Sequence, residues 1–195
     1  MDTLYQEALS RFQDLTRRAQ ALDVREPAAA ALATADENAR PSVRTVLVRE
    51  FDERGFVFYT NSQSRKGQEL AKNPQAALCF YWDALAEQVR IEGDIEFVTA
   101  QENEAYWNRR PRDRQVGAWV SNQSQRLESP LLLAQHYAEL ERRFADGDIP
   151  RPEHWFGYRL VPRRIEFWSN RPARLHERVV YERDASGWMT YLLYP

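Results

Sequence analysis

The stretch SVRTVLVREFDERGFVFYT (residues 42–60) determines the fold expected for this chain. Its first part is rich in β-branched residues and its last part, residues 56–60, is apolar and aromatic; both compositions are typical of β-strands. The segment between them, DERG (residues 52–55), is a polar turn that ends in glycine. Two strands joined by a short link that contains glycine pair in antiparallel fashion. The sequence therefore predicts a β-hairpin here and, with it, an antiparallel sheet.

Other segments with strand composition surround this hairpin. They lie at residues 28–34, 75–82, 87–97, 155–162, 163–169, 175–183 and 187–195. Because the strands follow each other without crossover helices, a parallel βαβ arrangement is disfavoured. Six or more antiparallel strands with glycine and proline turns predict a mainly β fold (α+β) with flanking helices, built as a small barrel or a sandwich.

Four helices are predicted, at residues 3–21, 64–74, 99–110 and 129–144. The third begins with a capping-box pattern, in which Glu102 follows Thr99 by three places. The stretch after it, up to residue 128, is polar and is expected to be a connection. We expect a single domain over residues 1–195, with an N-terminal helix at 1–22 and a barrel with helical insertions at 28–195.

Composition and sequence argue against several classes of protein. The 195 residues include 27 basic and 29 acidic side chains, so the net charge is −2, whereas a dedicated nucleic-acid binder carries a basic excess. No segment approaches the roughly 20 apolar residues of a membrane-spanning helix, and no apolar signal segment begins the chain. The single cysteine, Cys79, excludes an internal disulfide and a CxxC site. A cytoplasmic location is expected.

Familiar catalytic motifs are missing from the sequence. It contains no GxGxxG, GxxxxGK[ST], HExxH or GxSxG pattern. The three histidines, His136, His154 and His176, are scattered, which argues against a multi-histidine metal site. We therefore expect no metal centre.

Two groups of basic residues lie where an anion could bind. Arg44 interrupts a strand of apolar residues, where a charge is costly unless it is paired. Ser64, Arg65 and Lys66 open a helix, and a helix N-terminus with adjacent cations is a plausible phosphate site. Taken alone, the second group could equally be an ordinary capped helix.

Two further groups lie later in the chain. Aromatic residues bracket a run of cations at Arg109, Arg110, Arg112 and Arg114, which suits a flat anionic ligand or simply a solvated loop. In the stretch RPARLHER (residues 171–178), strand alternation predicts that Arg174, His176 and Arg178 project to one face, which could bind an anion or face solvent.

Several stretches of the sequence resemble those of a known protein family. The stretches that carry the likeness are FVFYTNSQSRKGQEL (56–70), FYWDALAEQVRIEG (80–93), RPRDRQVGAWVSNQSQ (110–125), IEFWSNRPARLHER (165–178) and the closing residues 187–195. They are similar to the pyridoxamine (pyridoxine) 5′-phosphate oxidases, in collinear order from Ala28 to Pro195. The resemblance implies a split β-barrel of antiparallel Greek-key type that binds flavin mononucleotide (FMN) at a homodimer interface, with dimerisation and active-site strands at the C-terminus.

The implied reaction oxidises pyridoxamine 5′-phosphate or pyridoxine 5′-phosphate to pyridoxal 5′-phosphate in vitamin B6 metabolism. Oxygen accepts the electrons and gives hydrogen peroxide, and ammonia leaves from the amine. The positions that match flavin contacts are Arg44, Thr45, Val46, Leu47, Tyr59, Thr60, Arg65, Lys66, Gln88, Gln123, Ser124, Trp168 and Arg178. Those that match the substrate site are Arg49, Tyr106, Arg110, Arg114, Arg174 and His176, of which Arg174 and His176 are expected to act in catalysis.

The chain departs from the family pattern at two substrate positions. It has Arg49 where lysine is usual and Arg114 where serine is usual. Both keep or add positive charge for a phosphate but are bulkier, so substrate fit is expected to differ. The sequence also begins at its first helix, without the N-terminal arm of longer members, so weaker closure over the substrate is expected.

Three other functions remain open from the sequence. A related FMN-dependent oxidase of the phenazine-biosynthesis type would share the flavin positions but tends to lose the RPRDxQxGAW loop. A non-catalytic flavin or pyridoxal phosphate carrier would bind cofactor without making peroxide. A nucleic-acid module would bind with a steep salt dependence.

Overall fold

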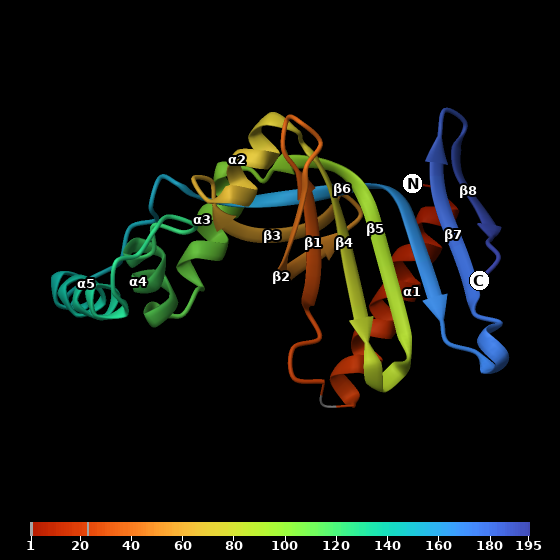
Figure 1. Ribbon diagram of the computed structural model, residues 1–195, viewed down its shortest axis with the longest axis horizontal. Coiled ribbons are helices and arrows are strands. Elements are labelled where there is room, and N and C mark those ends of the chain that lie inside the picture. Colours follow the sequence, from red (N-terminus) through yellow and green to blue (C-terminus); the bar gives the residue numbers. More distant parts are fainter. Residues whose placement is uncertain (1, 23) are drawn as a thin grey trace.

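The computed structural model describes residues 2–22 and 24–195 (Figure 1). Its strands are β1 (Ala29–Ala35), β2 (Pro41–Asp52), β3 (Gly55–Asn61), β4 (Gln75–Trp82), β5 (Glu87–Phe97), β6 (Trp155–Ser169), β7 (Glu177–Asp184) and β8 (Gly187–Leu192). Its helices are α1 (Thr3–Ala21), α2 (Arg65–Lys72), α3 (Ala100–Asn108), α4 (Arg112–Val120) and α5 (Pro130–Arg143), with short 3₁₀ turns η1 (Asp83–Leu85) and η2 (Pro172–Arg174).

Within the described residues, one antiparallel sheet has the strand order β3-β2-β1-β4-β5-β6-β7-β8. An additional pairing of β3 with β6 closes the first six strands into a barrel. The remaining strands, β7 and β8, continue the sheet beyond β6 and stand apart from the barrel in Figure 1. The predicted hairpin at residues 42–60 is confirmed, as is the antiparallel split-barrel class.

The N-terminal helix supplies part of the barrel core. Helix α1 buries Ala8, Phe12 and Leu15 along one face, as its helical spacing predicts. The Phe12 ring meets Phe56 and Phe80 edge-on, with ring centroids 5.0 Å apart in both pairs. Edge-to-face aromatic contacts add specific geometry to apolar burial, so α1 is part of the barrel's packing rather than an appendage.

Strand β6 corrects the prediction for residues 155–169. Two strands separated at Pro162 were expected, but one continuous strand pairs with β3, β5 and β7. The register of β5 on β6 shifts between Glu92 and Gly93, opposite Pro162. Such a bulge accommodates a proline, which has no N–H to donate. A Cβ on Gly93 would lie 2.0 Å from the Val161 carbonyl oxygen, so this close approach requires glycine.

Helix α4 occupies part of the stretch that was expected to be a polar connection. Gln115, Val116 and Val120 are its buried residues, and the two valines pack with Trp107 and Trp155 in a second, smaller core. Charged residues at 112–114 mask this short apolar face in the sequence. The structure thus adds a helical extension beside the barrel, formed by α3, α4 and α5 (Figure 1).

The predicted capping box at the start of α3 is present. The Thr99 side chain accepts from the Glu102 N–H, and the Thr99 N–H donates back to Glu102. The other oxygen of Glu102 accepts from Arg159 at 2.7 Å, and Arg159 is buried in β6. The carboxylate therefore ties the start of α3 to the barrel wall.

No helix in the described ranges is both long and apolar enough to cross a membrane.

We expect Glu102→Ala to destabilise the protein by about 3 kcal/mol, because it leaves the buried Arg159 guanidinium without its carboxylate. Urea unfolding followed by circular dichroism measures this loss. Glu104→Ala is the matched control, since Glu104 lies on the same helix in an exposed ion pair with Arg151 and should cost less than about 1 kcal/mol. Equal losses in the two variants would contradict the role of Glu102.

Candidate active site

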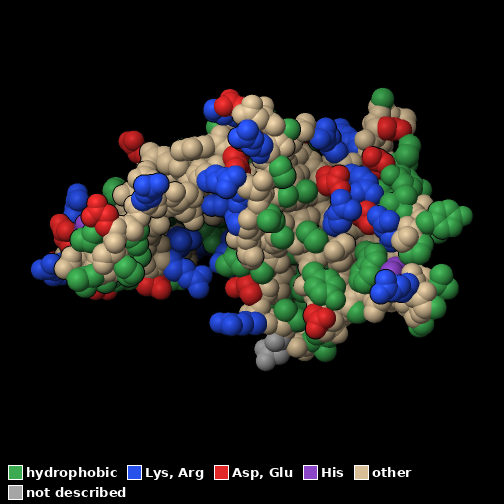
Figure 2. Space-filling view, viewed as in Figure 1, with side chains coloured by type: hydrophobic (Ala, Val, Ile, Leu, Met, Phe, Trp, Pro, Cys, Tyr) green, Lys and Arg blue, Asp and Glu red, His purple; other side chains and the backbone are tan. Residues whose placement is uncertain are grey.

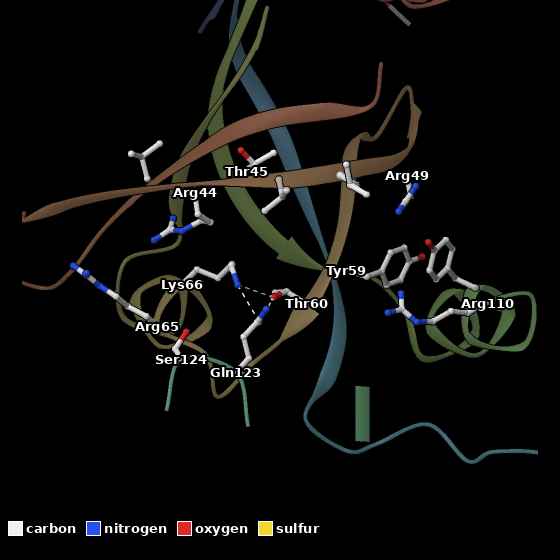
Figure 3. Close-up of a pocket in the computed structure, with 14 residues that line it drawn as sticks. Arg44, Thr45, Arg49, Tyr59, Thr60, Arg65, Lys66, Arg110, Gln123 and Ser124 are labelled. Carbon is white, nitrogen blue, oxygen red and sulfur yellow. Dashed lines mark hydrogen bonds between the residues drawn. The ribbon is translucent and has the colours of Figure 1, made fainter. Parts of the chain in front are cut away.

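A cavity of about 600 Å³ opens between β2, β3, the start of α2 and the helical extension. Its lining residues are Val43, Arg44, Thr45, Val46, Leu47, Arg49, Tyr59, Thr60, Arg65, Lys66, Tyr106, Arg110, Gln123 and Ser124 (Figure 3). In the space-filling view, Lys and Arg side chains gather around the hollow between the barrel and the extension (Figure 2). The cavity is large enough for a drug-sized or cofactor-sized ligand.

One end of the cavity carries Arg44, Arg65 and Lys66. Helix α2 begins here, with Ser64 as its N-cap accepting from the Gly67 N–H. Lys66 is buried, and its Nζ donates to Thr60 Oγ1 at 3.0 Å and to Gln123 Oε1 at 3.1 Å. Burial, together with the charge of Arg44, lowers the pKa of Lys66 to about 8. Three cations at a helix N-terminus form an anion-binding end.

The charge of Arg44 within strand β2 is paired, as its cost in a strand requires. Its Nη2 lies 3.1 Å from Oε2 of Glu69, a buried residue of α2. Burial alone would raise the pKa of Glu69, but hydrogen bonds from Thr34, Ser42 and Arg65 and the charge of Arg44 lower it to about 2. Sequence analysis missed Glu69, although its spacing of four residues from Arg65 on a helix is a signal for an ion pair.

The other end of the cavity carries Arg49 and Arg110 beside Tyr59 (Figure 3). Tyr106, which stacks on Tyr59, also lines the cavity. The register of β2 on β3 shifts between Val48 and Glu50, so Arg49 occupies a bulge. A bulge re-aims a side chain, which accounts for Arg49 facing the cavity. The two tyrosine rings stack with centroids 3.9 Å apart, giving this end a flat aromatic wall.

Arg110 and Arg114 lie close together. Arg110 Nε donates to the Arg114 carbonyl oxygen at 3.1 Å, and its guanidinium lies 5.3 Å from the ring centre of Trp155. Arg114 itself lines an adjoining cavity of about 390 Å³ that shares Arg110 and Tyr59 with the first. Burial and repulsion from Arg114 and Arg49 lower the pKa of Arg110. Within the described ranges, Arg49, Arg110 and Arg114 form no ion pair with a carboxylate, so acidic side chains of the chain do not neutralise these three charges.

Six predicted site residues lie outside this cavity: Arg114, which lines the adjoining one, and five residues from β5, β6, β7 and the turn before β7. Gln88 on β5, Trp168 on β6 and Arg178 on β7 are direct partners across the three strands. The His176 ring lies 4.7 Å from the Trp168 ring, and Arg174 precedes it in the turn η2. The predicted residues therefore form two groups on one chain: the cavity group and this strand-end group.

The prediction of a strand through residues 174–178 is wrong at its start. Ala173 and Arg174 both have left-handed backbone, with φ of 56° and 60°, and β7 begins only at Glu177. Pro172 and this tight turn override the alternation, so the shared face predicted for Arg174, His176 and Arg178 does not exist. Two successive non-glycine residues with positive φ are strained, and such strain is concentrated at functional sites.

The turn also fixes the orientation of His176. Its Nδ1 accepts from the Arg171 backbone N–H at 3.3 Å. A neutral imidazole whose Nδ1 accepts carries its proton on Nε2. His176 therefore presents an N–H donor on its free side.

Comparison with known proteins identifies the family. Residues 15–143 match the family described as pyridoxamine 5′-phosphate oxidase, and residues 155–195 match the pyridoxine 5′-phosphate oxidase C-terminal dimerisation region. The chain belongs to the pyridoxamine 5′-phosphate oxidase family. It is 55% identical over 194 residues to the pyridoxine/pyridoxamine 5′-phosphate oxidase of Alkalilimnicola ehrlichii, covering 98% of this chain and 99% of that protein. The Myxococcus xanthus oxidase of the same name is 50% identical over 189 residues, covering 97% and 92%.

Solved structures agree with this family fold. PhzG from Burkholderia lata, solved with tetrahydrophenazine-1-carboxylic acid, superposes with a TM-score of 0.92 at 35% identity, over 100% of this chain and 98% of that one. A pyridoxamine 5′-phosphate oxidase-related, FMN-binding protein from Nostoc punctiforme has a TM-score of 0.75 at 19% identity, over 100% and 98% of the chains. At that identity the second likeness supports the fold alone.

The cavity residues fit the flavin of this family by their chemistry. The end with Arg44, Arg65 and Lys66 suits a phosphomonoester, and backbone and side chains of residues 43–47 give a long wall for a flat ring. In the part of the chain that the structure describes, no group of three or more His, Cys, Asp or Glu residues could hold a metal ion.

Proposed function

We propose that this protein oxidises pyridoxamine 5′-phosphate and pyridoxine 5′-phosphate to pyridoxal 5′-phosphate with FMN as cofactor. The observation that carries the proposal is a single cavity with two separate cationic ends, one at Arg44, Arg65 and Lys66 and the other at Arg49 and Arg110. Two cationic ends suit two phosphorylated ligands held together, here the cofactor and the substrate. The names of the relatives support the same assignment.

FMN, when bound, supplies the two-electron oxidation and passes the electrons to oxygen. The chain's own residues hold and orient the two ligands. Arg65 and Lys66 would bind the flavin phosphate, while Thr60 and Gln123, already linked through Lys66, would keep that lysine aimed at it. Residues 43–47 would line one side of the ring. Placing both reactants in fixed geometry converts an encounter into an oriented step.

At the other end, Arg49 and Arg110 would bind the substrate phosphate, with the Tyr106 hydroxyl as a further donor. Arg114 stands beside Arg110 and adds charge to this end. The two departures from the family pattern, Arg49 and Arg114, thus lie in one cationic group rather than apart. Burial and, after it, repulsion from Arg114 and Arg49 lower the pKa of Arg110, and a phosphate among these guanidinium groups would relieve the repulsion.

The strand-end group completes the site if two copies of the chain associate. This group does not line the cavity of its own chain; its members are Gln88, Trp168, Arg174, His176 and Arg178. The dimerisation-region match covers residues 155–195, which include four of these five. In a two-fold dimer each cavity would receive the partner's strand-end group. Arg174 and the Nε2–H of His176 would then orient the substrate's C4′ amine or hydroxyl, with His176 as a donor.

The amine reaction consumes one oxygen and one water and releases pyridoxal 5′-phosphate, ammonia and hydrogen peroxide; the alcohol reaction needs no water and releases no ammonia. The test is to titrate the purified protein with FMN and then measure oxygen uptake with each phosphorylated substrate. We expect yellow holoprotein, peroxide from both substrates and ammonia from the amine alone. A protein that binds FMN but produces no peroxide would be a carrier, and one that binds no FMN would overturn the proposal.

A second candidate is an oxidase acting on a reduced phenazine carboxylic acid. The close superposition on PhzG favours it. A single carboxylate, however, gives no use for a cationic end built from Arg49, Arg110 and Arg114. Oxygen uptake with a dihydrophenazine carboxylic acid but not with the phosphorylated vitamers would favour this candidate.

FMN affinity should weaken as the pH rises from 7 to 9. The free protein loses the Lys66 proton near pH 8, so above that pH the phosphate dianion must bind together with a proton. We expect the Kd for FMN to increase about tenfold over this range. Quenching of flavin fluorescence measures this change. Lys66→Arg keeps its charge throughout and should show a nearly flat profile. If the Kd of Lys66→Arg increased with pH as much as that of the wild type, a group other than Lys66 would be responsible for the pH dependence.

A further inference from the structure

Glu69 lies behind the phosphate end of the cavity, between two of its arginines. It is buried on α2, and its side chain is only 6% exposed. Its Oε2 accepts from Thr34 at 2.5 Å and from Ser42 at 2.7 Å, and it also faces Arg44. Its Oε1 accepts from Arg65 Nε at 2.9 Å. One carboxylate therefore joins β1, β2 and α2.

The hydrogen bonds of Arg44 leave little of its guanidinium free. One terminal nitrogen, Nη1, donates to the Leu32 carbonyl oxygen at 3.1 Å and to Thr34 Oγ1 at 2.6 Å. The other, Nη2, donates to Ser42 and to Glu69. A guanidinium has five N–H donors, so only Nε–H has no protein partner among the described residues. Arg44 is thus held as a fixed part of the wall.

Arg65 is held in a different way. Its side chain is 65% exposed, and Glu69 is its carboxylate partner through Nε. Its terminal nitrogens remain available to a ligand. Glu69 therefore contacts a largely enclosed arginine through Oε2 and an exposed arginine through Oε1.

The charges at this end match a phosphomonoester. Arg44, Arg65 and Lys66 contribute three positive charges and Glu69 one negative charge, so the net charge is close to that of two cations. A phosphomonoester at neutral pH carries nearly two negative charges. Ordering two flexible side chains in advance removes an entropy cost that the ligand would otherwise bear on binding.

We propose that Glu69 is a positioning residue that preorganises Arg44 and Arg65 for the phosphate of the flavin cofactor. This inference rests on the proposed function, because it takes FMN as the ligand of this end. Glu69 does not contact the ligand itself; it acts through the two arginines. Its effect is therefore confined to the phosphate-dependent part of binding.

The test compares the dissociation constants of FMN and riboflavin, which differ only by the phosphate, measured by fluorescence quenching. We expect Glu69→Ala to weaken FMN binding about tenfold while riboflavin binding changes less than about twofold. Glu69→Gln should lose less than about threefold, because an amide oxygen in place of Oε2 keeps the contacts with Thr34, Ser42 and Arg44. Riboflavin affinity reports on the folding of each variant.

Glu37→Ala is the matched control, since Glu37 forms an exposed ion pair with Lys72, which lies on α2 as Glu69 does. It should leave both constants unchanged. If Glu69→Ala and Glu69→Gln both bound FMN more tightly, Glu69 would merely offset positive charge and the positioning role would be overturned. Equal losses for FMN and riboflavin would also overturn it. A wild-type protein that binds FMN no better than riboflavin would instead overturn the assignment of this end to the phosphate.

A second readout does not depend on the cofactor. In the free protein, the terminal N–H protons of Arg44 should exchange slowly with solvent, and NMR of arginine-labelled protein detects them, with Arg44→Lys giving the assignment. We expect Glu69→Ala to speed this exchange at least several-fold and Glu69→Gln to preserve it. Fast exchange in the wild type would contradict the immobile Arg44.

Discussion

Arg174→Ala is expected to lower turnover with pyridoxamine 5′-phosphate about 100-fold, with the FMN content of the protein unchanged. Arg174 is exposed on a strained turn, outside the cavity of its own chain. Under the proposed function, this exposed guanidinium would meet the substrate in the partner's cavity, and backbone strain is concentrated at such sites. Steady-state oxygen uptake and the flavin absorbance of the purified variant measure the two quantities.

Two variants separate the side chain of Arg174 from its backbone. Arg174→Gly removes the side chain, and glycine tolerates the φ of 60° at this position. This variant should therefore lose as much turnover as Arg174→Ala. Arg171→Ala is the matched control, because Arg171 lies in the same turn and its side chain pairs with Glu177. We expect Arg171→Ala to retain most of its activity. Full activity in Arg174→Gly would remove Arg174 from the substrate site.

Mixing two inactive variants should restore activity. Arg110→Ala damages the cavity group and Arg174→Ala damages the strand-end group. A heterodimer of the two would contain one site with both defects and one site with neither. Random exchange of equal amounts makes half of the dimers mixed, so about a quarter of all sites should be intact. Oxygen uptake after co-refolding should therefore rise from near zero to about a quarter of the wild-type rate.

The control for this experiment pairs two variants of the same group. Arg49→Ala and Arg110→Ala both damage the cavity end, so every site in their mixture keeps one defect. No recovery is expected for that pair. Recovery in both mixtures, or in neither, would contradict a site shared between two copies of the chain.

Much of the fold followed from local sequence patterns. The hairpin of β2 and β3, the helix α1 and the capping box of α3 each depend on spacings within a few residues, and all three were predicted. Helix α4 was missed because its apolar face is short and follows a run of charges. Strand β6 was divided at Pro162 because the bulge that tolerates proline depends on Gly93, about 70 residues away in the sequence.

The candidate site divides in the same way. The basic residues at 65–66 were recognised because a helix start is a local signal. Glu69 was missed because its role depends on β1 and β2, which the sequence does not place beside α2. The turn at Arg174 was predicted as a strand because alternating side chains mask the left-handed conformation of two residues. That the predicted residues lie in two separate groups became visible only in the folded chain.

The cluster of Arg49, Arg110 and Arg114 also bears on how long the empty protein survives. Like charges held together without a counterion weaken the folded state, whereas an anion that binds only the folded chain shifts the folding equilibrium by mass action. At a ligand concentration 100 times Kd, this shift is worth about 2.7 kcal/mol. Under the proposed function, the phosphorylated substrate would therefore also act as a folding ligand, and the unfolding temperature of the protein would rise with substrate concentration.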